Sequence, residues 1–138
     1  AEISKKYSGT PTGNIAKFYA GICNLNMGKY QEAISFLKDY SPDGNFTPVL
    51  KFGALGDAYA QLNDLKSAGE YYSKAISADD NETLTPVYLK KRAVLAASQN
   101  DIPMALNLYK QLKEKYPNTS LATDAERYID LYKLQLAK

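Results

Sequence analysis

The sequence predicts an all-α fold made of three helix-turn-helix repeats followed by one further helix. Small residues recur at equivalent places, apolar residues recur at the spacing of one helix face, and turn-forming residues separate the apolar stretches. The recurring small residues are Ala33, Ala68 and Ala105, at spacings of 35 and 37 residues, and Gly21, Gly56 and Ala93, each twelve residues earlier. Small residues at such places let the two helices of a repeat approach closely.

The segment from Phe52 to Ala75 carries the pattern most completely. Two apolar stretches flank a short break at Asn63 and Asp64, and in each stretch the apolar residues recur three and four positions apart. The first stretch contains Phe52, Leu55, Gly56 and Tyr59, and the second contains Leu65, Ala68, Tyr72 and Ala75. Aromatic residues set opposite Gly and Ala favour an antiparallel helix pair.

The signals that end helices agree with this division. Gly28, Asn63 and Asn100 each lie five residues before a recurring Ala, where a helix that ends needs a residue tolerant of the left-handed conformation. We therefore expect helices at about 13–27, 30–40, 48–62, 65–78, 85–99 and 102–115.

The signals that begin helices are of two kinds. Asp64 and Asp101 stand where the second helix of a repeat needs an N-cap, whereas Lys29 takes that place in the first repeat and caps poorly. Thr-Pro pairs at 10–11, 47–48 and 85–86 precede or open the first helices, and we expect each Thr hydroxyl to act as the cap.

A seventh helix is expected from about Ser120 to Leu136. Its predicted apolar stripe consists of Leu121, Ala125, Tyr128, Ile129, Tyr132 and Leu136, with charged residues opposite. A helix of this kind would cover the open apolar end of a stack of repeats.

The composition excludes several classes of function. The 17 basic and 15 acidic residues give a net charge of +2, which is too balanced for a nucleic-acid-binding surface. The chain contains no His, so the commonest general base and the commonest metal ligand are both missing. We therefore expect no catalytic site, no metal and no cofactor. No apolar run reaches the roughly 18 residues of a transmembrane helix.

Cys23 is the only cysteine, so an internal disulfide cannot form. It lies between Ile22 and Leu25 in the first expected helix, and no cationic neighbour is evident that would stabilise a thiolate. We therefore expect a small buried apolar residue rather than a reactive thiol.

The repeat resembles the tetratricopeptide repeat, a helix–turn–helix motif of about 34 residues. Counted from Val49, seven residues fall on the signature places of that family: Phe52, Leu55, Gly56, Tyr59, Ala68, Tyr72 and Ala75. The resemblance implies one domain over 1–138, a right-handed α-solenoid with repeats at about 13–47, 48–84 and 85–118 and a capping helix at about 119–136. The first repeat departs from the motif at Lys17 and Asn24, and the third departs at Arg92.

In this family the first helix of each repeat lines a concave face. The resemblance implies that the partner-binding residues are Ile15, Phe18, Ile22, Leu25, Asn26, Leu50, Asp57, Gln61, Lys90, Val94 and Ser98. An apolar strip with few polar groups suits an extended or helical peptide, which Asp57, Gln61 and Lys90 would orient. A grip on a C-terminal carboxylate, as in chaperone cofactors, is not expected, because only Lys90 fits it and Asp57 would repel the carboxylate.

Two other interpretations stay open beside a scaffold that binds a protein or peptide. The apolar residues Ile15, Phe18 and Ile22 could pack against the rest of a longer chain or form a homo-oligomer. The chain could also be the non-catalytic part of a larger enzyme.

A weaker resemblance concerns the cellular setting. The run from Lys115 to Ala122 is similar to repeat ends in bacterial envelope proteins of the outer-membrane assembly and translocon-associated types, which carry an N-terminal membrane anchor. It favours the periplasm or cell envelope over the cytoplasm. Because the run 6–10 echoes the run 115–119, we also expect this chain to be the C-terminal part of a longer protein.

Overall fold

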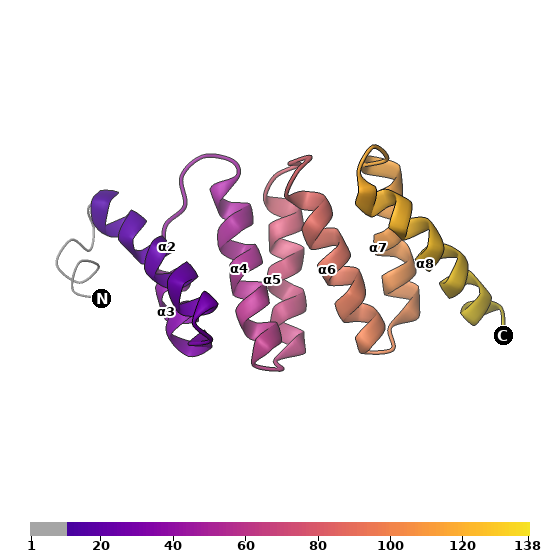
Figure 1. Ribbon diagram of the computed structural model, residues 1–138, viewed down its shortest axis with the longest axis horizontal. Coiled ribbons are helices and arrows are strands. Elements are labelled where there is room, and N and C mark those ends of the chain that lie inside the picture. The colour runs from indigo at the N-terminus through magenta and orange to yellow at the C-terminus, as the bar shows by residue number, and fades with distance from the viewer. Residues whose placement is uncertain (1–10) are drawn as a thin grey trace. The chain divides into compact units, whose positions relative to one another are not determined.

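The computed structural model describes residues 11–138, which form helices joined by turns and loops (Figure 1). Its helices are α2 (Pro11–Asn26), α3 (Tyr30–Asp39), α4 (Thr47–Gln61), α5 (Leu65–Ala78), α6 (Thr85–Ser98), α7 (Ile102–Lys115) and α8 (Ser120–Ala137). No strand occurs in the described range, so the all-α prediction is confirmed. Every helix begins and ends within two residues of its predicted bounds. The N-terminal run 6–10 and Thr10 lie outside the described residues.

The chain divides into two compact units between Ala78 and Asp79. In the first unit, α2 packs against α3 and α4 packs against α5, while α3 also packs against α4. A cluster of five buried residues holds the helices together: Ile34, Leu37, Ala54, Leu55 and Ala58. Gly21 permits the first of these helix pairs, because a Cβ at that position would lie 2.6 Å from Cγ of Leu37.

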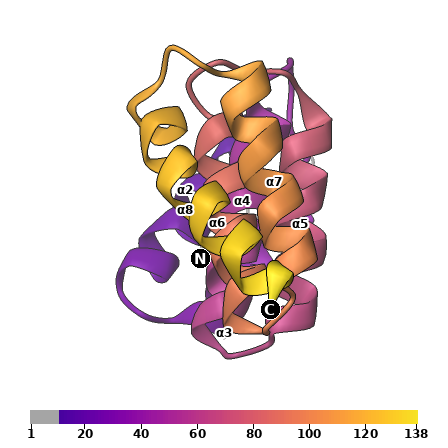
Figure 2. The same ribbon diagram turned by 90° about the vertical axis from the view of Figure 1, so that its right-hand side faces the viewer.

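In the second unit, α7 packs against both α6 and α8, which lie on the same side of it in the end-on view (Figure 2). Tyr109 of α7 is fully buried, and its ring stacks on that of Tyr128 with centroids 4.9 Å apart and planes 9° apart. Ala93, Ala105 and Ala125, one from each helix of the unit, are also fully buried. Small residues let helices pack closely, and burial of the apolar surface of Tyr109 stabilises the unit.

The helix ends follow the sequence signals closely. Gly28, Asn63 and Asn100 have φ angles of 78°, 61° and 60°, which is the left-handed conformation expected after a helix. Asp101 caps α7, because its Oδ1 accepts a hydrogen bond of 3.3 Å from the backbone N–H of Met104. Asp64 accepts the equivalent bond of 3.2 Å from Ser67. Lys29 makes no side-chain cap, as predicted.

The expectation for the Thr-Pro pairs is right about the helix starts and wrong about the cap. Thr47 and Thr85 are the first residues of α4 and α6 rather than the residues before them. The Thr47 hydroxyl donates backwards to the carbonyl of Asp43, and the Thr85 hydroxyl donates to the carbonyl of Asp79 over 2.8 Å. Each hydroxyl therefore secures the loop that enters the helix and leaves the first helical N–H groups to other partners.

Helix α8 departs from its predicted stripe at the C-terminal end. Ala125, Ile129 and Tyr132 are buried as expected, but Leu136 is 49% exposed. The reason is length, because α8 has 18 residues and the α7 on which it packs has 14, so the last turn of α8 has no helix beneath it. Leu134, which the pattern did not place in the stripe, is 66% exposed in the same turn.

Candidate functional site

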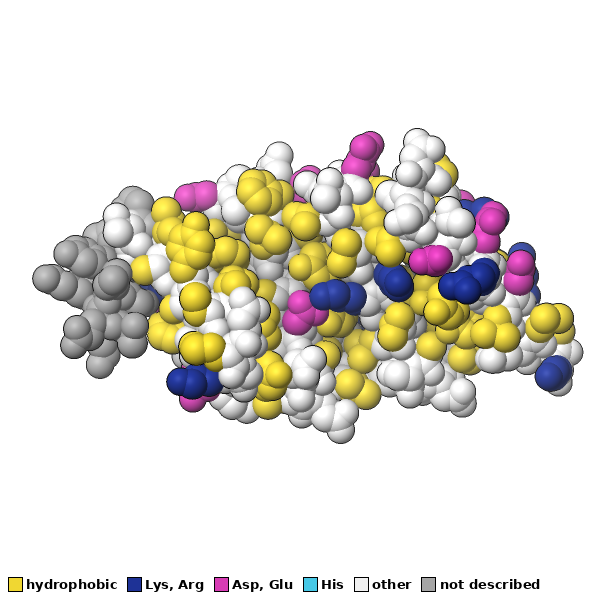
Figure 3. Space-filling view, in the orientation of Figure 1, with side chains coloured by type: hydrophobic (Ala, Val, Ile, Leu, Met, Phe, Trp, Pro, Cys, Tyr) yellow, Lys and Arg dark blue, Asp and Glu magenta, His cyan; other side chains and the backbone are white. Residues whose placement is uncertain are grey.

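The predicted partner-binding residues come from both units, and each unit presents its own face. On the side shown in Figure 3, hydrophobic side chains gather over α2 and α4 of the first unit, with few charged groups among them. Ile15, near the start of α2, is 52% exposed. Phe18, Ile22 and Leu25 are only partly buried, and they pack against the buried cluster of α3 and α4 residues described above. This face is therefore apolar and continuous with the interior.

The residues predicted on α4 share one side of that helix, because spacings of seven and four residues return to the same face. Leu50 and Asp57 are half-buried, whereas Gln61 is exposed, as is Asn26 on α2. The carboxylate of Asp57 accepts a hydrogen bond of 2.6 Å from the hydroxyl of Tyr72 on α5. The charge that was expected to orient a ligand is thus held in place by the partner helix of the same hairpin.

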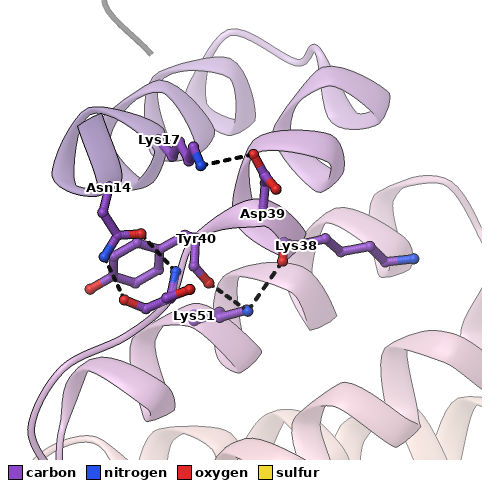
Figure 4. A network of polar contacts seen from close by, with 7 residues as sticks. Asn14, Lys17, Lys38, Asp39, Tyr40 and Lys51 are labelled. Carbon is purple, nitrogen blue, oxygen red and sulfur yellow. Dashed lines mark hydrogen bonds and ion pairs between the residues drawn. The ribbon is translucent and has the colours of Figure 1, made fainter. Parts of the chain in front are cut away.

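Polar contacts at one end of α2 fix its position against the end of α3 (Figure 4). Asn14 donates from Nδ2 to the carbonyl of Ser41 over 2.6 Å, and its Oδ1 accepts from the backbone N–H of Ser41 over 2.8 Å. Lys17 forms an ion pair of 3.0 Å with Asp39. Because these contacts bind α2 to the segment after α3, they hold Ile15 and Phe18 at the edge of the apolar face.

Lys17 occupies a position where a large apolar residue is usual, and the structure explains how a Lys is accommodated. The residue is only 8% exposed, so its stem fills the space of an apolar side chain while its ammonium reaches Asp39 at the surface. Its partner Asp39 is largely exposed, which keeps the pair in contact with water.

In the second unit the predicted residues lie on α6. Lys90 is half-buried, Val94 is 50% exposed and Ser98 is exposed. The hydroxyl of Ser98 donates to the carbonyl of Leu95 over 2.6 Å, so its hydrogen-bond partner lies within α6 itself. These three residues are spaced by four and lie along one side of α6.

The expectation that Cys23 is buried is wrong, because this residue is exposed. The buried positions of α2 are Gly13, Lys17 and Gly21, which recur every four residues on the side facing α3. Cys23 follows Gly21 by two residues, which is about 200° around the helix and places it on the other side.

Metal ligands and membrane-spanning helices were both sought among the described residues. No group of three or more Cys, Asp or Glu side chains there could hold a metal ion. None of the described helices is both long and apolar enough to span a bilayer.

Sequence reasoning missed a group of lysines beside aromatic rings in the first unit. Lys38 lies over the ring of Tyr59, and Lys74 lies over that of Tyr71. The spacing of Tyr71 and Lys74, three residues apart on one helix, is a signal that could have identified the second pair. The first pair joins α3 to α4, and no local spacing reveals it.

Comparison with known families supports the repeat architecture. Two family models, both described as tetratricopeptide repeat, match this chain. One matches residues 52–82, and the other matches residues 16–41 and 91–119. Each of the three helix pairs thus has its own match. No curated protein matches the chain.

Proposed function

Because the chain belongs to the tetratricopeptide repeat family, we propose that it is a non-enzymatic module that binds a peptide or helix of another protein. Repeats of this family generally mediate protein–protein interaction. The observation that carries the proposal is the apolar face of α2 and α4, in which Ile15 is half exposed and Phe18, Ile22 and Leu25 are only partly covered.

The binding mode that we propose is burial of apolar side chains with a few polar groups giving direction. An apolar side chain of the ligand that covers Ile15 would remove its exposed half from water, which is worth about 1 kcal/mol. Gln61, at the other end of the face, offers an amide that can donate and accept hydrogen bonds to an extended backbone. On the second unit, Lys90, Val94 and Ser98 repeat this mixture of apolar and polar groups and are proposed as contacts of the same kind.

A second candidate explains the same exposed apolar groups by a different occupant. Ile15 and Tyr19, four residues apart on α2, are both exposed, and a further segment of a longer chain or a second copy of this chain could cover them. In that case the module would be structural, and a free peptide would not compete for the face.

The setting that we propose is a bacterial cell envelope, with any membrane anchor preceding Ala1. Its support is the similarity of the run from Lys115 to Ala122 to repeat ends in envelope proteins. The sequence upstream of this chain in its gene tests this part. A lipoprotein signal or hydrophobic anchor there would support it, and an upstream segment with neither would contradict it.

The binding proposal is tested by selecting peptides from a random 12-residue display library on the immobilised chain. The Kd of each selected peptide is then measured for Ile15→Asp and for Leu131→Asp. Leu131 is the matched control, because it is also about half exposed and lies on α8, which carries none of the proposed contacts. Circular dichroism checks that both variants keep their helix content.

We expect Ile15→Asp to weaken binding of the selected peptides by about tenfold, because an ionised carboxylate replaces an apolar contact, while Leu131→Asp leaves Kd unchanged. Equal effects of the two variants would contradict the proposed face. If no peptide is enriched and Ile15→Asp instead turns a dimer into a monomer in sedimentation, the structural alternative is supported and the peptide-binding proposal fails.

A further inference from the structure

Three aromatic rings lie in series between α4 and α5 of the first unit. The ring of Tyr71 stacks on that of Tyr59 with centroids 5.4 Å apart and planes 6° apart, and on that of Phe52 with centroids 6.3 Å apart. Phe52 and Tyr59 each follow a residue of the proposed peptide-binding face, Leu50 and Asp57, by two positions. They are therefore about 200° around α4 from that face.

Three lysines surround this series of rings. Lys74 lies with its Nζ 4.9 Å from the centroid of Tyr71 and 5.8 Å from that of Phe52. The Nζ of Lys51 lies 5.9 Å from the centroid of Phe52, and that of Lys38 lies 5.5 Å from the centroid of Tyr59. We call these six residues the lysine–aromatic ladder. The negative faces of the rings attract the ammonium groups and hold each of them beside the series.

The positive charge of the ladder is only partly compensated. Lys51 donates to the carbonyls of Tyr40 and Lys38 at the C-terminal end of α3, over 2.7 and 3.4 Å (Figure 4). Its positive charge therefore stabilises the C-terminal end of that helix. Burial lowers the pKa of Lys51, and the neighbouring ammonium of Lys74 lowers it further. The one carboxylate that acts against this, Asp39, is already paired with Lys17.

Lys38 and Lys74 are both exposed, and within residues 11–138 neither forms an ion pair. Glu70 precedes Lys74 by one turn of α5, but no ion pair joins them there. Each of these two ammonium groups thus lies beside an aromatic ring and is paired with no carboxylate of the described residues. An acidic segment that runs along the ladder could place one carboxylate beside each of them.

The chemistry of the ladder favours a carboxylate-bearing peptide over a nucleic acid. The rings of Tyr59 and Tyr71 cover each other's faces, so a nucleobase could not insert between them. The net charge of the whole chain is only +2, which is too small to attract a polyphosphate backbone at ordinary salt. Lysines on flexible stems beside partly exposed rings instead suit Asp or Glu side chains interspersed with apolar ones.

We propose that the lysine–aromatic ladder is a second interaction surface, which binds an acidic segment of a partner protein through Lys38 and Lys74. It lies on the opposite side of α4 from the peptide-binding face, so the two surfaces of the first unit can be occupied at once. The proposal does not depend on the first surface being functional.

The test measures fluorescence anisotropy of a labelled deca-glutamate peptide with the whole chain at low and physiological salt. A labelled ten-nucleotide oligothymidylate is the second probe. The double variant Lys38→Gln/Lys74→Gln is compared with Lys29→Gln/Lys66→Gln. The second pair is the matched control, because both of its lysines are exposed residues of the same unit and it removes the same charge. All four side chains are at the surface, so both variants should fold.

We expect the ladder variant to raise the Kd of deca-glutamate by about fivefold and the control variant to change it less than twofold. Equal loss in both variants would show a general charge effect and overturn the proposal. It would also be overturned if deca-glutamate does not bind, or if the oligothymidylate binds more tightly and loses binding in the ladder variant.

Discussion

Gly56 of α4 lies directly beneath the ring of Tyr72 of α5. A Cβ at Gly56 would fall 2.5 Å from both Cδ1 and Cε1 of that ring. The ring itself is fixed, because Tyr72 is buried and its hydroxyl donates to Asp57 over 2.6 Å. This contact leaves no room for a Cβ at position 56, and it explains why the recurring small residue in the middle of the sequence is a Gly.

Gly56→Ala should therefore destabilise the chain although Ala is the better helix former. The intrinsic preference of about 1 kcal/mol for Ala is outweighed by overpacking against a ring that cannot move, so we expect a net loss of about 1–2 kcal/mol in the free energy of unfolding. Urea unfolding followed by circular dichroism measures it. The double variant Gly56→Ala/Tyr72→Leu should be more stable than the sum of the two single effects predicts. A stabilised single variant would contradict the close approach.

The left-handed residue at the turn of the third helix pair gives a second prediction. Asn100 has a φ of 60°, which Gly adopts freely and β-branched residues avoid. Asn100→Gly should leave the free energy of unfolding nearly unchanged, and Asn100→Val should lower it by about 1–2 kcal/mol. Asn118→Val, at an exposed site without a positive φ, is the control. If both Val variants are equally stable, the turn does not need the left-handed conformation.

The ion pair of Lys17 and Asp39 gives a third prediction. Lys17 is buried, so Lys17→Leu should keep or raise stability, because it removes the cost of burying an ammonium group. Asp39→Asn leaves that ammonium without its partner and should cost about 1 kcal/mol, less than in a fully buried pair because Asp39 is largely exposed. Thermal unfolding of the two variants measures both effects. A large loss in Lys17→Leu would show that the charge itself is needed for the fold.

The second unit should lose stability at high pH, because two of its tyrosines would then lose their protons. Burial raises the pKa of Tyr109 to about 12, and burial together with the hydrogen bond to Asp80 raises the pKa of Tyr116 to about 12. The neutral form is favoured by folding, so the stabilisation is complete below the unfolded pKa of about 10 and is lost as the pH rises towards 12.

Unfolding midpoints in urea, measured at a series of pH values, test this dependence. Tyr109→Phe and Tyr116→Phe should each reduce the loss of stability between about pH 10 and pH 12, because Phe has no proton to release. A Tyr19→Phe variant, at an exposed position in the first unit, should show the same loss as the original chain. Identical pH profiles for all four proteins would contradict the raised pKa values.

The helix bounds could be predicted from the sequence because the signals for them are local. The positive φ angles at Asn63 and Asn100 and the cap at Asp101 depend on residues within one turn, and each is visible as a residue type at a fixed offset. The small residues could be recognised because three repeats present them at the same places.

The features that could not be predicted depend on contacts between helices. Cys23 was expected inside because its neighbours are apolar, but its exposure is set by which side of α2 faces α3. Lys17 looks polar in the sequence and is buried because Asp39, 22 positions later, reaches its ammonium. Leu136 follows the helical stripe but projects past the end of α7. Such outcomes require the packing partner to be known.

Amide NMR spectra recorded with a selected peptide show whether the apolar face of α2 and α4 holds the partner. We expect the amides whose shifts change most to gather around Ile15, Phe18, Leu50 and Gln61, with those of Lys38 and Lys74 unchanged. Shift changes confined to residues away from α2 and α4, with that face unaffected at saturating peptide, would contradict it.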